Sequence, residues 1–329
     1  MSHAGAMDSS TQNTASDSHP TTTAVTRRRV LAGIGLGAAA AASGITGIRP
    51  AAAAPGTAPD AGRIAALIAD LERRHDVRIG LSAAALTGPY RGRRLDHRAD
   101  ERFLMLSVFK AIAAAAVLDG RLITPDPKVL DRPVFLPPEA ICEGPAWFAE
   151  QIATRRAPSV AEVCRAAIQL SDSTAANALL SLTGGPDSIT RFARDNGDPV
   201  TQLTEWEPEL NTPDGDRNTT SPRAIGALFA AMIVGRALRT PARRRLTDWM
   251  LGNQTSDQRF RAGLPAGWTL ADKTGSGIDA TANDVGIAFD PAGNAYQLAV
   301  LTSSPRPDTE RVNEIFAILA REALAELTS

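Results

Sequence analysis

The chain has 329 residues, of which 43% are hydrophobic, and a formal net charge of −1. This length and apolar content can bury a sizeable core and fill one or two domains. A charge so near zero gives no general attraction to nucleic acid or to an anionic membrane, and we expect neither as a partner. Because only His75 and His97 follow the first 54 residues, we also expect no histidine triad and no histidine-rich zinc or other metal site.

Residues 1–54 have the order of a bacterial export signal: a polar start, the basic stretch TRRRVL, a Gly/Ala-rich apolar run and small residues suited to cleavage. Paired arginines before a weakly apolar run favour twin-arginine export, with the export machinery as partner and a secreted or periplasmic product. The alternative is an uncleaved anchor, since the run approaches spanning length. Ala and Gly contribute little to insertion, so we expect no stable membrane insertion after cleavage.

After this leader, the hydrophobic pattern changes period several times. Helical spacing predicts a helix over 61–76, and two strand-like segments follow it. From 103 to 251 the pattern is mostly helical. Three strand-like segments lie between 268 and 304, and a final helix is predicted over 310–327.

Strands at both ends of the mature chain, with helices between them, predict an α/β (α+β) fold. We expect one antiparallel sheet, flanked by helices and completed by both ends of the chain, with an all-helical domain inserted into it. The sheet domain is assigned to 55–102 and 252–329, and the helical domain to 103–251, including a loop at about 202–220. The cleft between the two is where a substrate site is expected.

Lysine occurs only three times, against 32 arginines, so Lys110 and Lys273 invite an explanation. A lysine in an apolar helix can be shifted toward neutrality and act as a base, which an arginine cannot. Ser107 lies one helical turn before Lys110 on the same face, so its hydroxyl could lose a proton toward the amine as it attacks. An N-cap serine followed by a snorkelling lysine is the structural alternative.

Three other short motifs allow both a structural and a chemical interpretation. SDS at 171–173 is typical of a helix-capping turn, but its first serine could also relay a proton to a leaving nitrogen. KTGSG at 273–277 is an ordinary Gly-rich turn, or a place where its lysine anchors a carboxylate that the threonine and serine also bind. EWEPELN at 205–211 is either a solvated turn or a loop that holds one carboxylate in place to move protons.

Taken in order, SVFK, SDS, EPELN and KTGSG resemble the motifs of the class A serine β-lactamases, of the actinobacterial type exported by the twin-arginine route. The resemblance covers nearly the whole mature chain and includes RAGLPAGW before the last motif. It implies a β-lactamase/DD-peptidase-like fold with a five-stranded antiparallel sheet. It also implies a monomeric hydrolase without a cofactor, whose substrates are small-molecule β-lactams such as penicillins and cephalosporins.

The resemblance also implies the roles of single residues. Ser107 would be the nucleophile, Lys110 its proton partner and Ser171 the relay to the departing nitrogen, while the backbone N–H groups of Ser107 and Ser276 would form the oxyanion hole. Glu207 would activate the water that releases the product. Whether the lysine or the glutamate also drives acylation stays open.

The substrate's own groups would be bound by a further set of residues. Lys273, Thr274 and Ser276 would hold the substrate carboxylate. Arg259 would assist them, because Ala282 stands where many members have an arginine. Two other residues complete the set: Asn211 would help to hold the water, and Ser173, in place of the commoner asparagine, would make part of that residue's contacts to the substrate and the lysine.

The departures from the family lie around the 202–220 loop. Glu205 and Asn218 stand where an arginine and an aspartate usually close the neck of this loop, and we expect Glu205 to pair with Arg217 instead. Two rival functions stay open. A penicillin-binding DD-peptidase or esterase would share the Ser/Lys chemistry but lack EPELN, and a weakly catalytic, secreted β-lactam-binding homologue is suggested by the altered loop and SDS. Cys142 and Cys164 could pair in an oxidising compartment, but their spacing does not establish that they meet.

Overall fold

The computed structural model describes residues 60–329, apart from 124–125, 138–139, 280 and 306–308. The export signal expected over 1–54 therefore lies outside the described residues. None of the helices in the described part is long and apolar enough to cross a bilayer.

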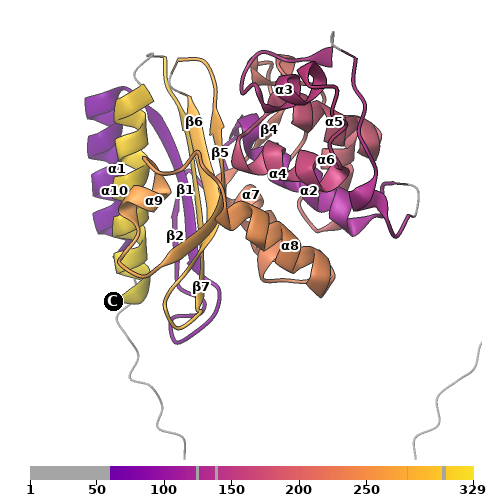
Figure 1. The fold of residues 1–329 in the computed structure, drawn as a ribbon. Coiled ribbons are helices and arrows are strands. Elements are labelled where there is room, and N and C mark those ends of the chain that lie inside the picture. Colours follow the sequence, from indigo (N-terminus) through magenta and orange to yellow (C-terminus); the bar gives the residue numbers. More distant parts are fainter. Residues whose placement is uncertain (1–59, 124–125, 138–139, 280, 306–308) are drawn as a thin grey trace, which may run out of the picture. The chain divides into compact units, whose positions relative to one another are not determined.

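Five antiparallel strands form one sheet in the order β2-β1-β7-β6-β5 (Figure 1). The strands are β1 (Arg78–Ala85), β2 (Arg94–His97), β5 (Thr269–Ser276), β6 (Ala282–Phe289) and β7 (Ala295–Ser303). β1 pairs with β7 along its whole length, so the first and last strands of the chain are neighbours. This confirms the predicted five-stranded antiparallel sheet that both ends of the chain complete.

Helices cover both faces of the sheet (Figure 1). The helices α1 (Ala61–His75) and α10 (Thr309–Thr328) pack on one face, and α7 (Pro222–Ile233) packs on the other. β6 and β7 are therefore buried along nearly their whole length. Successive residues of a strand face opposite sides, so each face of the sheet contributes to a separate hydrophobic core.

The segment between β1–β2 and β5 is mostly helical, as predicted. Its other α-helices are α2 (Phe109–Asp119), α3 (Trp147–Ala153), α4 (Val160–Gln169), α5 (Ser173–Thr183), α6 (Asp187–Asp195), α8 (Thr240–Leu251) and the short α9 (Phe260–Gly263). α2 contacts α4, α5, α6 and α8, and its residues 109–117 are all buried. Its run of alanines lets these helices approach closely, and the same crowding removes Lys110 from water.

One part of the fold was not predicted from the sequence. Residues 103–104 form a strand of their own, β3 (Phe103–Leu104), which pairs with β4 (Thr219–Thr220) in a separate two-stranded sheet. Two residues are too few to show a strand period, so this pairing depends on contacts far apart in sequence. It joins the end of the 202–220 loop to the segment that leads into Ser107.

Candidate active site

Ser107 lies in a short 3₁₀ turn, Leu106–Val108, that leads directly into α2. The residue before it, Leu106, has φ 51°, a left-handed conformation that is unusual for a branched side chain. Gly275 lies against this turn: a Cβ there would come within 2.8 Å of the Leu106 Cβ and 3.3 Å of the Ser107 nitrogen. The KTGSG strand therefore approaches the serine closely because residue 275 has no side chain.

Lys110 is completely buried and forms an ion pair with Glu207, whose side chain is 2% exposed. The distance from Lys110 Nζ to Glu207 Oε1 is 3.0 Å. Nζ also donates to the Ser171 carbonyl at 2.7 Å and to Ser173 Oγ at 3.1 Å, so its three hydrogens have three acceptors. Burial lowers the pKa of Lys110, and the charge of Glu207 opposes that shift without reversing it.

The hydroxyl of Ser107 donates to Glu207 Oε1 at 3.5 Å rather than to Lys110. The sequence predicted a direct serine–lysine pair on one helix face, and the structure places the carboxylate between the two. The physical reason is that an ammonium group has no lone pair to accept from the serine, whereas the carboxylate can accept from both groups. Ser107, Lys110 and Glu207 thus form one cluster joined by a hydrogen bond and an ion pair.

Two asparagine side chains fix Glu207, one at its carboxylate and one at its backbone. Asn211 Nδ2 donates to Glu207 Oε2 at 2.7 Å. Asn177, on α5, binds the Glu207 backbone twice: its Nδ2 donates to the carbonyl oxygen at 3.0 Å, and its Oδ1 accepts from the N–H at 3.0 Å. Sequence reasoning missed Asn177, although its place one helical turn after Ser173, on the same face of α5, was a usable signal.

Lys273, on β5, reaches the same cluster from the sheet. It is fully buried, and its Nζ donates to Ser171 Oγ at 3.1 Å and to the Thr274 carbonyl at 2.8 Å. Burial, and then the charge of Lys110, lower the pKa of Lys273 to about 7. Ser171 therefore touches both lysines, one through its carbonyl and one through its hydroxyl.

Arg259 lies behind the KTGSG strand and is 4% exposed. Its Nη2 donates to Ser276 Oγ at 2.7 Å, and its Nη1 donates to the Gly275 carbonyl at 2.7 Å and the Asn283 carbonyl at 2.9 Å. Thr274 Oγ1 shares a hydrogen bond with Thr255 Oγ1. Arg259 therefore lies against Ser276, which is on the strand that also carries Lys273.

Two buried acids that the sequence reasoning did not consider lie on this strand and its neighbour, Asp272 on β5 and Asp284 on β6. Asp272 accepts from Asn253 Nδ2 at 2.7 Å and from Arg261 at 3.1 Å, and Asp284 accepts from Ser256 Oγ at 2.8 Å. Burial raises the pKa of both carboxyls. The negative charges of these two acids raise the pKa of Lys273, in opposition to burial, which lowers it.

The neck of the 202–220 loop has the expected ion pair between Glu205 and Arg217. Both side chains are partly exposed, 34% and 48%. Asn218 is buried, and its Oδ1 accepts from the Thr204 N–H at 2.9 Å, the Thr204 hydroxyl at 3.3 Å and the Glu205 N–H at 3.1 Å. The neutral amide, rather than the ion pair alone, closes the neck.

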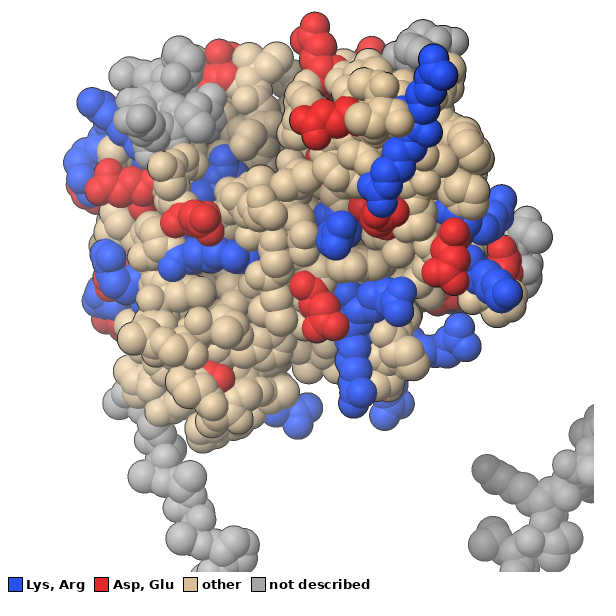
Figure 2. Space-filling model, in the orientation of Figure 1, with Lys and Arg blue, Asp and Glu red and all other residues tan. Residues whose placement is uncertain are grey.

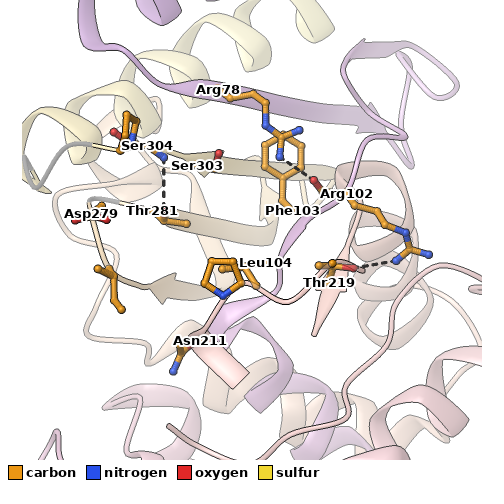
Figure 3. A pocket seen from close by; sticks show the side chains of 14 residues that line it. Arg78, Arg102, Phe103, Leu104, Asn211, Thr219, Asp279, Thr281, Ser303 and Ser304 are labelled. Carbon is orange, nitrogen blue, oxygen red and sulfur yellow. Dashed lines mark hydrogen bonds between the residues drawn. The ribbon is translucent and has the colours of Figure 1, made fainter. Parts of the chain in front are cut away.

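A cavity of about 520 Å³ lies beside this loop (Figure 3). Asn211 stands at its edge, and Leu104 and Thr219 line it. The guanidinium of Arg78 lies over the Phe103 ring at 3.8 Å from the ring centroid. Over the molecular face that Figure 2 shows, acidic and basic side chains are interspersed.

Cys142 and Cys164 are both free, which answers the question that the sequence left open. Burial raises the pKa of each thiol. Cys142 lies at the site, with its Sγ 3.7 Å from the Glu207 carbonyl oxygen and 3.2 Å from Asn177 Nδ2. Within the described residues, no cluster of three or more His, Cys, Asp or Glu side chains could hold a metal ion.

Known proteins match both the sequence and the fold. A family model described as the β-lactamase enzyme family matches residues 63–327. A β-lactamase from Streptomyces fradiae is 45% identical over 306 residues, which are 91% of this chain and 96% of the relative. Among the solved structures that match is the β-lactamase from Streptomyces albus G, which is 40% identical and aligns over 81% of this chain and 98% of that one with a TM-score of 0.74. Another is a class A β-lactamase from Mycobacterium abscessus, which is 34% identical and aligns over 81% of this chain and 100% of that one with a TM-score of 0.76. The chain therefore belongs to the β-lactamase enzyme family, and within it to the actinobacterial class A enzymes.

Proposed function

We propose that the protein hydrolyses the β-lactam amide of penicillins and cephalosporins through an acyl-enzyme on Ser107. The observation that carries the proposal is the buried carboxylate of Glu207, within reach of the Ser107 hydroxyl and the Lys110 amine and bound by Asn211. A stable acyl-enzyme would leave the serine blocked. A base beside the serine lets water release the product, which favours a hydrolase over a penicillin-binding target.

In acylation, Ser107 Oγ attacks the lactam carbonyl carbon, and its proton passes to the Glu207–Lys110 pair. The negative charge that develops on the carbonyl oxygen is bound by the backbone N–H groups of Ser107 and Ser276. The C–N bond then breaks, and the nitrogen takes the hydroxyl proton of Ser171. Ser171 in turn receives the proton held by the Glu207–Lys110 pair, so Glu207 is again a free carboxylate. Because Ser171 Oγ accepts from Lys273, its own hydrogen is free for this transfer.

The substrate carboxylate is bound by Lys273, Thr274 and Ser276, with Arg259 supplying a second positive charge. Both cations are buried, so water and salt screen their charges only weakly. Ser173 faces the Lys110 amine and contacts the carbonyl of the substrate's acyl side chain.

In deacylation, Glu207 removes a proton from a water molecule that attacks the acyl carbon. Asn211 donates to Glu207, while its own Oδ1 is buried without a partner among the described residues and can accept from that water. The 202–220 segment acts as an Ω-loop that carries both residues to the serine. The proton then returns to Ser107 as the acyl group leaves.

The test uses purified protein and a chromogenic cephalosporin. We expect repeated turnover, and a loss of about 10³-fold or more in Ser107→Ala, because that variant has no nucleophile. Ser82→Ala, which changes a buried serine of β1, is the matched control and should hydrolyse at the wild-type rate. One equivalent of lasting adduct on the wild type, without turnover, would instead identify a β-lactam-binding target.

Export and organisation complete the proposal. The segment 1–54 directs twin-arginine export to the secreted or periplasmic space, and the mature enzyme is a monomer. Its two parts are a sheet domain (55–102 and 252–329) and a helical domain (103–251). The basic stretch and the weakly apolar run support export. Exported protein should have an intact mass that lacks about the first 54 residues, and full-length protein confined to the cytoplasm would refute this part.

A further inference from the structure

Asn283, on β6, is completely buried and lies opposite Gly275 in the pairing of β5 with β6. Its Nδ2 donates to two successive carbonyls, Leu104 at 2.8 Å and Met105 at 3.0 Å. Its Oδ1 is also buried and has no partner within the described residues. An unpaired buried acceptor disfavours folding, so any favourable contribution of this side chain comes from the hydrogen bonds that its Nδ2 donates.

The two carbonyls that Asn283 binds immediately precede the strained turn at Leu106 and the nucleophile Ser107. A left-handed leucine persists only where the surrounding structure holds it in place. From the other side, the Met105 N–H donates to the Asn218 carbonyl at 2.8 Å. The segment before Ser107 is thus fixed between the 202–220 loop and the Asn283 amide.

The backbone of Asn283 is tied to the other half of the site. Its carbonyl accepts from Arg259 Nη1, and the same guanidinium binds the Gly275 carbonyl and Ser276 Oγ. One residue therefore links, through its side chain, the segment that carries Ser107 and, through its backbone, the segment that carries Ser276. These are the two residues whose N–H groups face the developing negative charge in the proposed reaction.

We propose that Asn283 is a positioning residue for the oxyanion hole: it fixes the Ser107 N–H relative to the Ser276 N–H. The inference rests on the proposed β-lactam hydrolysis. Such donors bind the tetrahedral oxyanion more strongly than the planar substrate carbonyl. Loss of the Asn283 donor should therefore slow the reaction while substrate binding changes little.

The decisive variant is Asn283→Leu, which keeps a similar volume and removes both hydrogen bonds. We expect kcat/KM for a chromogenic cephalosporin to fall by about 100-fold, with KM changed by less than about 3-fold. A phenylboronic acid, which becomes tetrahedral on Ser107, should bind less tightly by a similar factor. If Asn283→Leu does not fold, Asn283→Ser, which keeps one hydroxyl donor, replaces it with a smaller expected loss in both quantities.

Gln297→Leu is the matched control. Gln297 is also a buried amide of the sheet that donates to a main-chain carbonyl, that of Ser82 at 2.8 Å, but neither group belongs to the site contacts. It should lose a similar amount of stability and keep wild-type kcat/KM and boronate affinity. If a folded variant at position 283 keeps wild-type kcat/KM and boronate affinity, the inference about Asn283 is wrong and the proposed function still stands. If the wild-type protein shows no turnover, the proposed function itself is wrong.

Discussion

Two of the three lysines in the chain are fully buried, and both touch Ser171. Elsewhere the chain uses arginine almost wherever it needs a positive charge. A lysine differs from an arginine in that burial can bring its pKa into the physiological range, and burial lowers the pKa of both Lys110 and Lys273. For Lys110 this fits the proposed part in proton transfer, whereas Lys273 is proposed to bind the substrate carboxylate in its charged form.

The pH dependence of substrate binding tests this interpretation of Lys273. Because its pKa is lowered to about 7, Lys273 is positively charged below that pH and neutral above it. The KM for a penicillin should therefore rise, and kcat/KM fall, as the pH increases through about 7. In Lys273→Arg the guanidinium stays charged, so this alkaline loss should disappear even if the rate is lower throughout. Parallel pH profiles in the two proteins would refute the assignment.

At the scale of elements, the 202–220 loop brings Glu207 to Ser107, and its neck sets where the carboxylate lies. The Glu205–Arg217 pair at the neck is partly exposed, and such pairs contribute at most about 1 kcal/mol. Asn218 is buried and satisfies three donors, so its removal leaves polar groups without partners. The buried amide therefore contributes more to loop closure than the reversed ion pair that the sequence predicted.

Asn218→Ala should reduce the free energy of unfolding by about 2 kcal/mol and slow deacylation, because Glu207 loses its fixed position. Asn218→Asp keeps an acceptor oxygen and tolerates the left-handed backbone at this position, φ 56°, so it should lose much less. Glu205→Ala should cost under about 1 kcal/mol. Denaturant unfolding and single-turnover kinetics check all three, and a larger loss in Glu205→Ala than in Asn218→Ala would show that the ion pair closes the neck.

In the molecule as a whole, the elements that could be predicted are those whose hydrophobic pattern repeats along the chain. Apolar residues at helical spacing predicted α1 and α10, and short apolar segments predicted the central strands of the sheet. The motifs located Ser107, Lys110 and Lys273 because each lies at a fixed offset within one helix or strand. Glu207 and Arg259 needed the family resemblance, since neither lies close in sequence to the serine.

The parts that could not be predicted all depend on contacts across long stretches of sequence. β3 and β4 are two residues each and exist because they pair with each other. Asn283 acts on a segment that precedes it by 178 residues. A side-chain amide has no sequence signature that distinguishes a surface role from such a bridge.

The central claim is that Glu207 activates the water that releases the acyl group from Ser107. Its most direct test is the intact mass of Glu207→Gln after mixing with a cephalosporin, with Glu209→Gln on the same loop as the control. We expect Glu207→Gln to accumulate one covalent equivalent of substrate and its deacylation to slow by about 10²-fold or more, because the amide cannot accept the proton. Steady-state hydrolysis at the wild-type rate in Glu207→Gln, without an adduct, would contradict the account.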